Sequence, residues 1–335
     1  MSKVKVFSSG QNLENFGGAQ KMLVDIHNGL KEYFDSTILG FCNFDKLDSN
    51  YQISDSEYLR FCNPYNIRGA VILIHARKLT TFFHFLDKVF SLNLTLIYVS
   101  HNLYTDLRQF TFLPKNIVSI SDVVTQNLVQ YFGANPSTIT KIHNGIPDKG
   151  GSALKVDKTT DTIRILYSAR VTSVKRQVEI VRNLKGKLND NIIVTFAGSG
   201  PQYDLLLSES KDAKHFEAVG FVDDIHAFIK DFDYVLLFSS KEGLPISLME
   251  GCMYGKPLVV NNVGGNLEIG IPGQNAFLAE NFDDLVTVIN SLPNSTTSLY
   301  NSMSLKSRGV YDDYFKYEVM LKKYVDLIHK SFYEK

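Results

Sequence analysis

The sequence predicts an α/β protein made of two doubly wound, Rossmann-like domains, and three observations support this. Short apolar runs alternate with helix-length amphipathic segments from end to end, which is the pattern of parallel sheets covered by helices. The 335 residues exceed the usual size of one hydrophobic core. A polar, glycine-containing stretch over residues 148–162 divides the alternating series in two, as an interdomain linker would.

Each half of the chain has its own series of strand-like runs. In the first half we expect strands at residues 4–8, 36–41, 70–74, 94–100, 116–119 and 138–142. In the second half we expect them at residues 163–169, 192–197, 215–220, 234–238 and 258–261. Residues 314–332 have apolar side chains at helical spacing. The sequence therefore predicts domains over residues 1–147 and 148–313, with a C-terminal helix within 314–335 that completes the first domain.

Composition excludes several classes of partner. Thirty-five basic residues balance thirty-five acidic ones, so no overall field draws the chain to nucleic acid or to an anionic membrane. The three cysteines are scattered without metal-ligand spacing, and such a sparse set suits a reducing compartment. No apolar run approaches the roughly 20 residues of a spanning helix, and the chain does not open on a signal-peptide pattern. We expect a cytoplasmic or peripheral protein that binds no nucleic acid.

Two glutamates, Glu242 and Glu250, are the strongest candidate site residues. Glu242 follows a buried strand and precedes Pro245, which favours the start of a helix, so we expect it in a strand-to-helix turn. Glu250 then lies in that helix, whose N-terminus at Gly243, Leu244 and Pro245 would attract a phosphate. A carboxylate can bind two hydroxyls at once, which suits the vicinal diols of a sugar. Alone, the pair is equally consistent with a helix cap and a surface glutamate.

Arg170 and Lys175 form a second constellation. Arg170 leaves a predicted strand end and Lys175 opens the next helix, so two cations converge on one loop. An arginine fork and a lysine would stabilise the charge that grows on a pyrophosphate leaving group. Without the glutamates, two solvated surface charges would be the simpler interpretation.

In the type and order of these motifs, the sequence resembles the family 4 retaining glycosyltransferases of the GT-B fold, whose signature is Glu-x7-Glu. The resemblance implies two Rossmann-like domains facing each other across a cleft, the first binding the acceptor and the second the donor. It implies that Glu242 contacts the donor hexose and Glu250 the ribose hydroxyls. The chain departs from the family pattern at Gly251, where alanine is commoner, and at Ala169 and Arg176, where glycine is commoner.

The resemblance extends to the first half of the chain. Gly17 and Gly18 match the family's glycine-rich loop, which helps to hold the donor phosphates, although a glycine pair alone indicates only a tight turn. His101, which follows an apolar strand, resembles the family's functional histidine, and its alternative role is to end that strand. His75 and His143 also end strand patterns, and we interpret both as structural.

Glycine-containing turns support the donor-binding half. Two of them are the runs that begin at Gly198 and Gly264. The third is the segment Gly220, Phe221 and Val222, and the matching segment of the family lies against the nucleotide base. The Gly198 run resembles a dinucleotide fingerprint, but that fingerprint belongs after the first strand and needs a third glycine. A nicotinamide oxidoreductase is therefore disfavoured.

No metal and no other cofactor is expected. The aspartate pairs at residues 223–224 and 283–284 look like the metal-binding pairs of another glycosyltransferase class. Each pair precedes a helix pattern, so we interpret both as helix N-caps. The resemblance implies that the nucleotide-sugar is a substrate and that catalysis needs no metal.

The expected function is transfer, with retention, of a hexose-type sugar from a nucleoside-diphosphate sugar, with UDP as the expected nucleotide. The acceptor is a glycan or lipid-linked acceptor of O-antigen or capsule biosynthesis. Arg170, Lys175 and the helix N-terminus would stabilise the departing diphosphate during a front-face attack. A sugar-nucleotide epimerase of similar fold and a non-catalytic nucleotide-sugar-binding module remain the alternatives.

Family habit also implies a lipid carrier at the inner membrane face. Basic and aromatic residues in one segment would suit such a contact, namely Lys78, Phe82, Phe83, Phe85 and Lys88. A helix that covers the first domain accounts for the same pattern.

Overall fold

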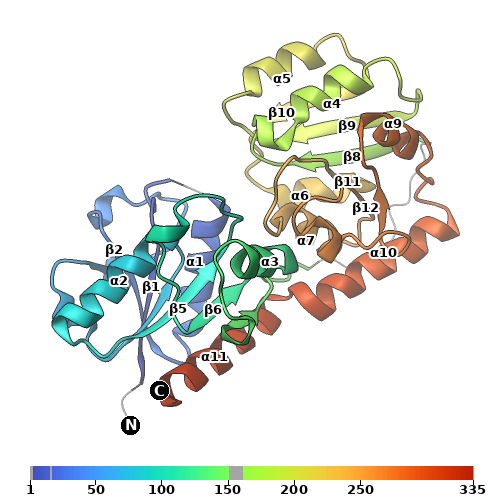
Figure 1. The fold of residues 1–335 in the computed structure, drawn as a ribbon. Helices are drawn as coiled ribbons and strands as arrows, with labels where there is room; N and C mark the ends of the chain where they lie inside the picture. Colours follow the sequence, from blue (N-terminus) through green and yellow to red (C-terminus); the bar gives the residue numbers. More distant parts are fainter. Residues whose placement is uncertain (1–2, 16, 151–160, 335) are drawn as a thin grey trace. The chain divides into compact units, whose positions relative to one another are not determined.

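The computed structural model describes residues 3–15, 17–150 and 161–334, and the chain divides into two compact units (Figure 1). Unit 1 comprises Met1–Gly145 and Glu318–Lys335, and unit 2 comprises Ile146–Tyr317. The boundaries expected from the sequence, after residues 147 and 313, fall close to these divisions. Residues 151–160 of the expected linker lie outside the described part of the chain.

Within the described residues, unit 1 is built on a seven-stranded parallel sheet of order β3-β2-β1-β4-β5-β6-β7. Its strands are β1 (Lys5–Ser9), β2 (Asp35–Gly40), β3 (Tyr58–Arg60), β4 (Val71–Ile74), β5 (Thr95–Ser100), β6 (Asn116–Ser119) and β7 (Ile139–Lys141). Its helices are α1 (Gly18–Leu30), α2 (Arg77–Phe90), α3 (Asp122–Gln130) and, from Glu318 on, α11 (Tyr317–Tyr333). Every residue of β4 is buried, because helices cover both faces of a parallel sheet.

Helix α2 is a covering helix of unit 1. Its Leu79, Phe83 and Leu86 are buried in the core beneath it. Phe83 is fully buried, so the expectation that it could touch a membrane is wrong. Phe85 on the opposite face is 62% exposed, and Phe82 packs its ring on neighbouring phenylalanines. In the part of the chain that the structure describes, no helix is both long and apolar enough to cross a bilayer.

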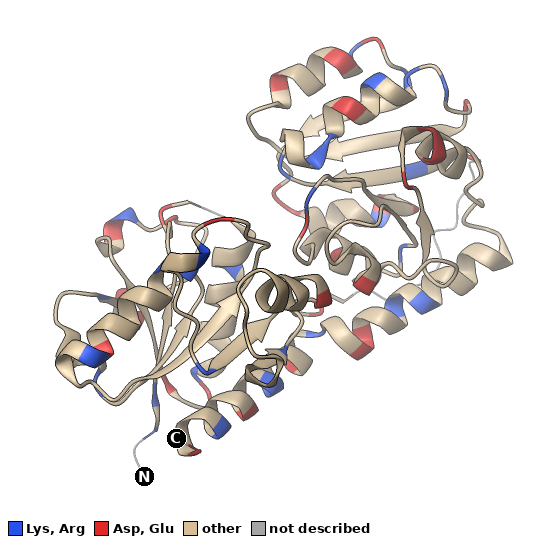
Figure 2. Cartoon of the chain, viewed as in Figure 1, with Lys and Arg blue, Asp and Glu red and all other residues tan. Residues whose placement is uncertain are grey.

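Unit 2 has, over its described residues, a six-stranded parallel sheet of order β10-β9-β8-β11-β12-β13. Its strands are β8 (Ile163–Ser168), β9 (Ile192–Ala197), β10 (Phe216–Gly220), β11 (Tyr234–Leu237), β12 (Leu258–Val260) and β13 (Ala276–Leu278). Its helices are α4 (Gln177–Leu184), α5 (Tyr203–Ser210), α6 (Ile225–Phe228), α7 (Ile246–Met253), α8 (Asn266–Ile269), α9 (Phe282–Asn290) and α10 (Ser298–Val310). Basic and acidic residues are interspersed along both units (Figure 2), in keeping with the balanced composition.

The structure corrects three expectations about elements. Strands β3 and β13 were not predicted, because three-residue strands leave too short an apolar pattern. The C-terminal helix begins at Tyr317 rather than residue 314, since Ile146 N donates to Phe315 O (2.9 Å) and Tyr317 N donates to Ile146 O (3.1 Å). These two bonds hold Lys316 in an extended conformation between the π-helical turn 311–315 and α11.

The two aspartate pairs behave differently from each other. Asp224 caps α6, with its side chain accepting from Ala227 N at 2.9 Å, so that prediction is confirmed. Asp283 and Asp284 lie inside the first turn of α9, and the N-cap is Asn281, whose side chain accepts from Asp284 N. The cap prediction is wrong there because an asparagine two positions earlier supplies the acceptor.

In each sheet the direction in which successive strands are added reverses once, and the position of this reversal, the switch point, is where ligands of such sheets bind. In unit 1 the reversal lies between β1 and β4, which pair with Ser9 opposite Ile74. In unit 2 it lies between β8 and β11, which pair with Leu166 opposite Val235. At such a switch point the loops after the two strands run in opposite directions, which opens a crevice at the carboxyl ends of the strands.

Candidate active site

An ion pair joins the two loops at the switch point of unit 2. Lys175 lies on the loop after β8, and Glu242 lies on the loop after β11. Lys175 Nζ is 2.6 Å from Glu242 Oε1, and the side chains are 23% and 8% exposed. A carboxylate this deeply buried requires a charged partner. The structure therefore brings together one predicted cation and the first predicted glutamate.

Hydrogen bonds to backbone carbonyls fix the positions of the two loops. Ser240 N donates to Val174 O at 2.8 Å, which ties the loop of Glu242 to that of Lys175. The buried Tyr167 hydroxyl donates to Lys175 O at 2.5 Å. Burial, and secondarily the charge of Glu242, raises the pKa of Tyr167 well above its ordinary value, so this donor stays protonated. Sequence reasoning missed Tyr167 and Ser240, since a tyrosine in an apolar strand carries no signal of such a contact.

Arg176 explains one departure from the family pattern. Its φ is +58°, a left-handed conformation that glycine adopts without strain. Side-chain contacts stabilise an arginine at this position, because its guanidinium lies 5.1 Å from the ring centroid of Phe238 and 4.5 Å from that of Phe282. Its Nε also bonds Glu179 Oε2 at 3.0 Å. The backbone therefore keeps the glycine-like conformation although the side chain differs.

Arg170 lies on the same loop as Lys175 with an exposed side chain. Its carbonyl accepts from Gln177 Nε2 at 3.1 Å, which fixes the backbone. Among the residues that the structure describes, its guanidinium has no hydrogen-bond or ion-pair partner. It is thus available to an anion at the carboxyl end of β8.

Helix α7 begins directly after the loop of Glu242. Pro245 is its N-cap residue and supplies no side-chain acceptor to the first-turn amides. Leu244 and Pro245 are buried, and Gly243 O accepts from Gly265 N at 2.8 Å. Glu250 lies in the second turn of α7, inside the helix as predicted, and is half-buried.

Two glycines allow the loops to approach closely. A Cβ on Gly264, whose φ is +58°, would lie 2.1 Å from Glu242 O. A Cβ on Gly198, whose φ is +146°, would lie 2.0 Å from Ala169 O. No side chain fits at these distances, so both positions require glycine.

The predicted base-contacting segment lies at the end of β10. Gly220 is the last residue of that strand, and Phe221 directly after it is 69% exposed. Val222 is half-buried. An exposed aromatic ring at the carboxyl end of a strand can stack on a planar ligand.

Gly17 and Gly18, two of the predicted residues of unit 1, lie after β1, beside its switch point. Gly17 is the N-cap of α1 and Gly18 its first residue. Gly17 N donates to Tyr51 Oη (3.3 Å), and Tyr51 Oη donates to Asn15 O (2.8 Å). Gly17 is extended, with φ −162°, and a Cβ there would lie 2.7 Å from the side-chain oxygen of Gln20. The backbone of Gly17 is therefore open to other residues, and a Cβ there would meet only the flexible end of the Gln20 side chain.

His101 follows β5 and pairs with His75, which follows β4. Nδ1 of His75 is 2.9 Å from Nε2 of His101, and the rings stack at 18° with centroids 5.1 Å apart. Burial lowers the pKa of His101 to about 4. Burial, and then His101, lowers the pKa of His75 well below its ordinary value. Both imidazoles are neutral near pH 7, and the expectation that His75 only ends a strand missed this contact.

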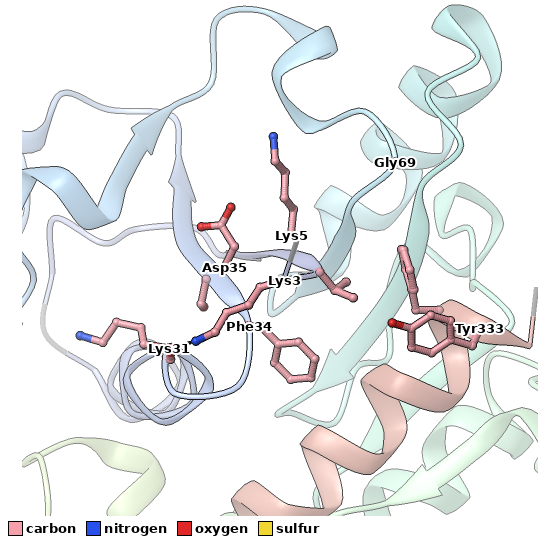
Figure 3. Close-up of a pocket in the computed structure, with 10 residues that line it drawn as sticks. Lys3, Lys5, Lys31, Phe34, Asp35, Gly69 and Tyr333 are labelled. Atoms are coloured by element: carbon pink, nitrogen blue, oxygen red, sulfur yellow. Dashed lines mark hydrogen bonds between the residues drawn. The ribbon is translucent and has the colours of Figure 1, made fainter. Parts of the chain in front are cut away.

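A hollow of about 790 Å³ also lies on unit 1, at the opposite end of its sheet, lined by Lys3, Lys5, Lys31 and Tyr333 among others (Figure 3). Lys3 Nζ donates to backbone oxygens of Lys31 (3.4 Å) and Glu32 (3.0 Å), and Lys31 bonds Glu57. We do not assign the active site to it, because ligands of such sheets bind at the carboxyl ends of the strands. Over the described residues, no group of three or more His, Cys, Asp and Glu could hold a metal ion.

Comparisons with known proteins find similarity to glycosyltransferases. Residues 154–309 match the family model described as Glycosyl transferases group 1. The O-antigen biosynthesis glycosyltransferase WbnH of Escherichia coli is 25% identical over 201 residues, 56% of this chain and 57% of that protein. The capsular polysaccharide biosynthesis glycosyltransferase CapH of Staphylococcus aureus is 24% identical over 161 residues, 46% of this chain and 44% of that protein. The matches thus span about half the length of these relatives.

Solved structures match the whole chain. Anabaena Alr3699/HepE in complex with UDP superposes with a TM-score of 0.82 at 15% identity, covering 98% of this chain and 100% of that one. The lipopolysaccharide outer core galactosyltransferase WaaB gives 0.77 at 15% identity, covering 99% of both chains. These likenesses, with the two parallel sheets, confirm the GT-B fold.

Proposed function

We propose that the chain is a retaining glycosyltransferase of family 4 type, a hexosyltransferase that uses a nucleoside-diphosphate sugar. The acceptor is a glycan or lipid-linked acceptor of surface-polysaccharide biosynthesis, and the site of action is the cytoplasm or the inner membrane face. The observation that carries the proposal is the Lys175–Glu242 pair at the switch point of unit 2. It sets a buried carboxylate and an ammonium side by side where α/β sheets bind their ligands.

The carboxylate would hold the donor hexose. An ionised carboxylate has about four acceptor positions, and Lys175 uses one of those on Glu242. The others accept from sugar hydroxyls. Glu250, which lies in the second turn of α7, would accept hydrogen bonds from the ribose hydroxyls.

The cations and the α7 N-terminus would stabilise the departing diphosphate. Lys175 has three N–H donors, of which one serves Glu242. The remaining donors, the Arg170 guanidinium and the first-turn amides after Pro245 favour an oxyanion. Fixed positive groups of this kind stabilise charge that develops in the transition state, and here they would do so without a metal or other cofactor.

The base would lie near Phe221. Strand β10 is two positions from β8 in the sheet, so their carboxyl ends are about 10 Å apart at the usual strand spacing. That separation suits a nucleotide whose diphosphate lies at β8 and whose base stacks near β10. The Anabaena protein was crystallised with UDP and with UDP-glucose, which supports UDP as the nucleotide here.

Donor binding tests the proposal most directly. Wild-type protein is mixed with UDP, UDP-glucose, UDP-galactose or GDP-mannose, and the shift of thermal unfolding is measured, since a bound donor stabilises the fold. Lys175→Met and Glu242→Gln should abolish the shift. Lys187 is an exposed lysine of unit 2 whose Nζ lies 3.8 Å from Asp283 Oδ1. The variant Lys187→Met is therefore the matched control, and it should keep the thermal shift.

Product analysis tests the reaction class. Incubation with the donor that stabilises the fold, followed by NMR of the sugar, should show an anomeric configuration equal to that of the donor. Isomerisation of the donor sugar without acceptor would favour the epimerase, and inversion would contradict retention. No stabilisation by any nucleotide-sugar would overturn the proposal.

A further inference from the structure

The tripeptide Phe-Cys-Asn occurs twice in unit 1, at residues 41–43 and 61–63. The first copy directly follows β2, and the second directly follows β3. These strands are parallel neighbours, and their last residues lie opposite each other in the register. The two copies therefore leave the sheet side by side, which places Cys42 beside Cys62 at its carboxyl edge.

Contacts of the phenylalanines show that the pairing continues beyond the two strands. Phe61 N donates to Gly40 O at 2.8 Å, which adds one bond to the ladder. The ring centroids of Phe41 and Phe61 lie 5.7 Å apart, and both rings contact one phenylalanine of α2. Both side chains therefore point to the α2 face of the sheet. Because successive side chains alternate between faces, Cys42 and Cys62 are directed to the opposite face.

Tyr58 of β3 holds Cys42 on that opposite face. Its hydroxyl donates to Cys42 O at 2.9 Å and lies 3.5 Å from Cys42 Sγ, although the chain bends at residues 41 and 42. Gly40 leaves room for this contact, since a Cβ there would lie 2.0 Å from the Tyr58 hydroxyl oxygen. Alternation along the chain directs Cys62, four positions after Tyr58, to the same face. The contact with Tyr58 therefore keeps Cys42 on the side of Cys62.

The spacing of parallel strands suits a disulfide between these two cysteines. Neighbouring strands lie about 4.8 Å apart, and the Cα atoms of a disulfide lie about 4.4–6.8 Å apart. Both residues come after the last paired residues of their strands, so their side chains can turn toward each other. Both are free thiols in the structure, with Cys62 exposed and Cys42 half-buried. A small oxidant in solution can therefore reach the pair.

The third cysteine lacks these features. Cys252 is fully buried in unit 2, and burial raises the pKa of its thiol to about 12. Its Sγ lies 3.7 Å from Ser307 Oγ and 3.5 Å from Asn275 Nδ2. A buried, protonated thiol is unreactive, because the thiolate is the nucleophile. Cys252 therefore serves as an internal control.

The segment between the two cysteines, residues 43–61, supports the turn that joins β1 to α1. Asp48 N donates to Leu13 O at 3.0 Å, and Tyr51 Oη donates to Asn15 O at 2.8 Å. Tyr51 and Leu13 also belong to one buried apolar cluster. A bond between the two cysteines would close a loop around this segment, so it would restrain the residues that hold the turn after β1.

We propose that Cys42 and Cys62 are a redox-sensitive pair, which a small disulfide oxidises to an intramolecular disulfide that restrains residues 43–61 and the turn after β1. In a reducing compartment the pair is reduced, as it is in the structure, and a disulfide there is transient and senses oxidation. The inference does not depend on the proposed function, because it concerns only residues of unit 1 and their thiol chemistry.

Oxidised glutathione supplies the oxidising equivalents. The Cys62 thiolate attacks one of its sulfurs, which forms a mixed disulfide and releases one glutathione thiolate. The Cys42 thiolate then attacks the Cys62 sulfur, which forms the protein disulfide and releases the second glutathione thiolate. In sum one S–S bond breaks and one forms, and the two protein thiol protons pass to the two glutathione thiolates.

Peptide mapping tests whether the bond forms. The full chain is treated with oxidised glutathione, the remaining thiols are blocked with iodoacetamide, and the protein is digested with trypsin. Cleavage after lysine and arginine places Cys42 in the peptide 32–46 and Cys62 in the peptide 61–68. We expect mass spectrometry to find these two peptides linked, and to find them separate after reduction with dithiothreitol.

Thermal unfolding and amide hydrogen exchange measure what the bond does. Closing a loop of this length should raise the Tm of unit 1 by roughly 5–10 °C and slow exchange in the turn after β1. Cys42→Ser and Cys62→Ser should each lose both effects, whereas Cys252→Ala, the matched control, should keep them. Each effect is the difference between the oxidised and reduced forms of one variant, so a change in basal stability cancels.

Three outcomes would overturn the proposal. In the first, both thiols remain free or the reaction stops at a mixed disulfide of Cys62 with glutathione. In the second, Cys62 bonds to Cys62 of another chain, which a non-reducing gel shows as a dimer. In the third, the two peptides are linked but exchange in the turn after β1 is unchanged, which would refute the restraint of that turn.

Discussion

The two switch points share a topology and differ in chemistry. In unit 2 the loops after β8 and β11 meet through a charged pair, Lys175 and Glu242. In unit 1 the loops after β4 and β5, beside β1, meet through two stacked, neutral histidines. The sheet order creates a crevice in both units, but the residue types on the loops decide what each crevice can bind.

The difference concerns which partner of a hydrogen bond the protein supplies. In unit 2 the buried Glu242 carboxylate offers only acceptors, which suits hydroxyl groups, whereas the described residues that line the pocket beside His75 in unit 1 supply amide, guanidinium and ammonium donors and no carboxylate. The predictions below test this contrast, from the largest expected effect to the smallest.

Breaking the charged pair should have the largest effect. Lys175→Met should lower turnover about 10²–10³-fold, as loss of one fixed group that stabilises transition-state charge does. It also leaves Glu242 buried without its cation, which destabilises the fold by about 3–5 kcal/mol. Initial rates and urea unfolding measure the two effects.

The double variant Lys175→Met/Glu242→Gln separates these two effects. It should regain most of the stability, because no buried charge remains, while activity stays lost. Recovery of activity together with stability would show that the pair is structural, and near-normal turnover in Lys175→Met would contradict its assignment.

Gly264→Ala should be the next most harmful change. Its Cβ would lie 2.1 Å from Glu242 O in a left-handed conformation, so the loop of Glu242 must move. We expect a loss of about 3 kcal/mol and loss of donor binding. Gly309→Ala in α10 is the control, because nothing lies within 4 Å of a Cβ there. Equal unfolding free energies of the two variants would refute this account.

Acid should destabilise unit 1 through its buried histidines. Burial, and then Lys31, lowers the pKa of His27 to about 4, so at pH 5 the unfolded chain binds a proton that the folded chain does not. Stability therefore falls as pH drops from about 6.5 toward 4, by about 2 kcal/mol for this histidine between pH 7 and pH 5.

The variant His27→Gln isolates that contribution from the carboxylates, which titrate in both proteins. Urea unfolding at pH 7 and pH 5 should show a smaller loss in the variant than in the wild type. An equal loss would mean that His27 is not held neutral by burial.

The smallest effect concerns Arg176 and tests whether its backbone is strained. Arg176→Ala loses the contacts with Phe238 and Phe282 and keeps the left-handed conformation, whereas Arg176→Gly loses the same contacts and relieves the strain. Arg176→Gly should therefore be about 1–2 kcal/mol more stable than Arg176→Ala. Thermal unfolding of the pair measures the difference, and Arg176→Gly being the less stable would contradict it.

The sequence by itself determined the pattern of elements and the chemistry-bearing residue types. The predicted strands at 116–119 and 192–197 have those same bounds in the structure, since each has β-branched apolar residues buried in the sheet. Glu242 before α7 and the cations after β8 could be found because each belongs to one local motif. Edge strand β3 could not, because three residues show no periodicity.

Only the tertiary structure decided which of these residues touch. Lys175 and Glu242 are 67 positions apart, and they meet because β8 and β11 are neighbours in the sheet. His75 and His101 are 26 positions apart and meet through the pairing of β4 and β5. Local sequence patterns contain no information on strand order, so a contact between the loops of neighbouring strands, and the burial and pKa that follow from it, arise only when the sheet is assembled.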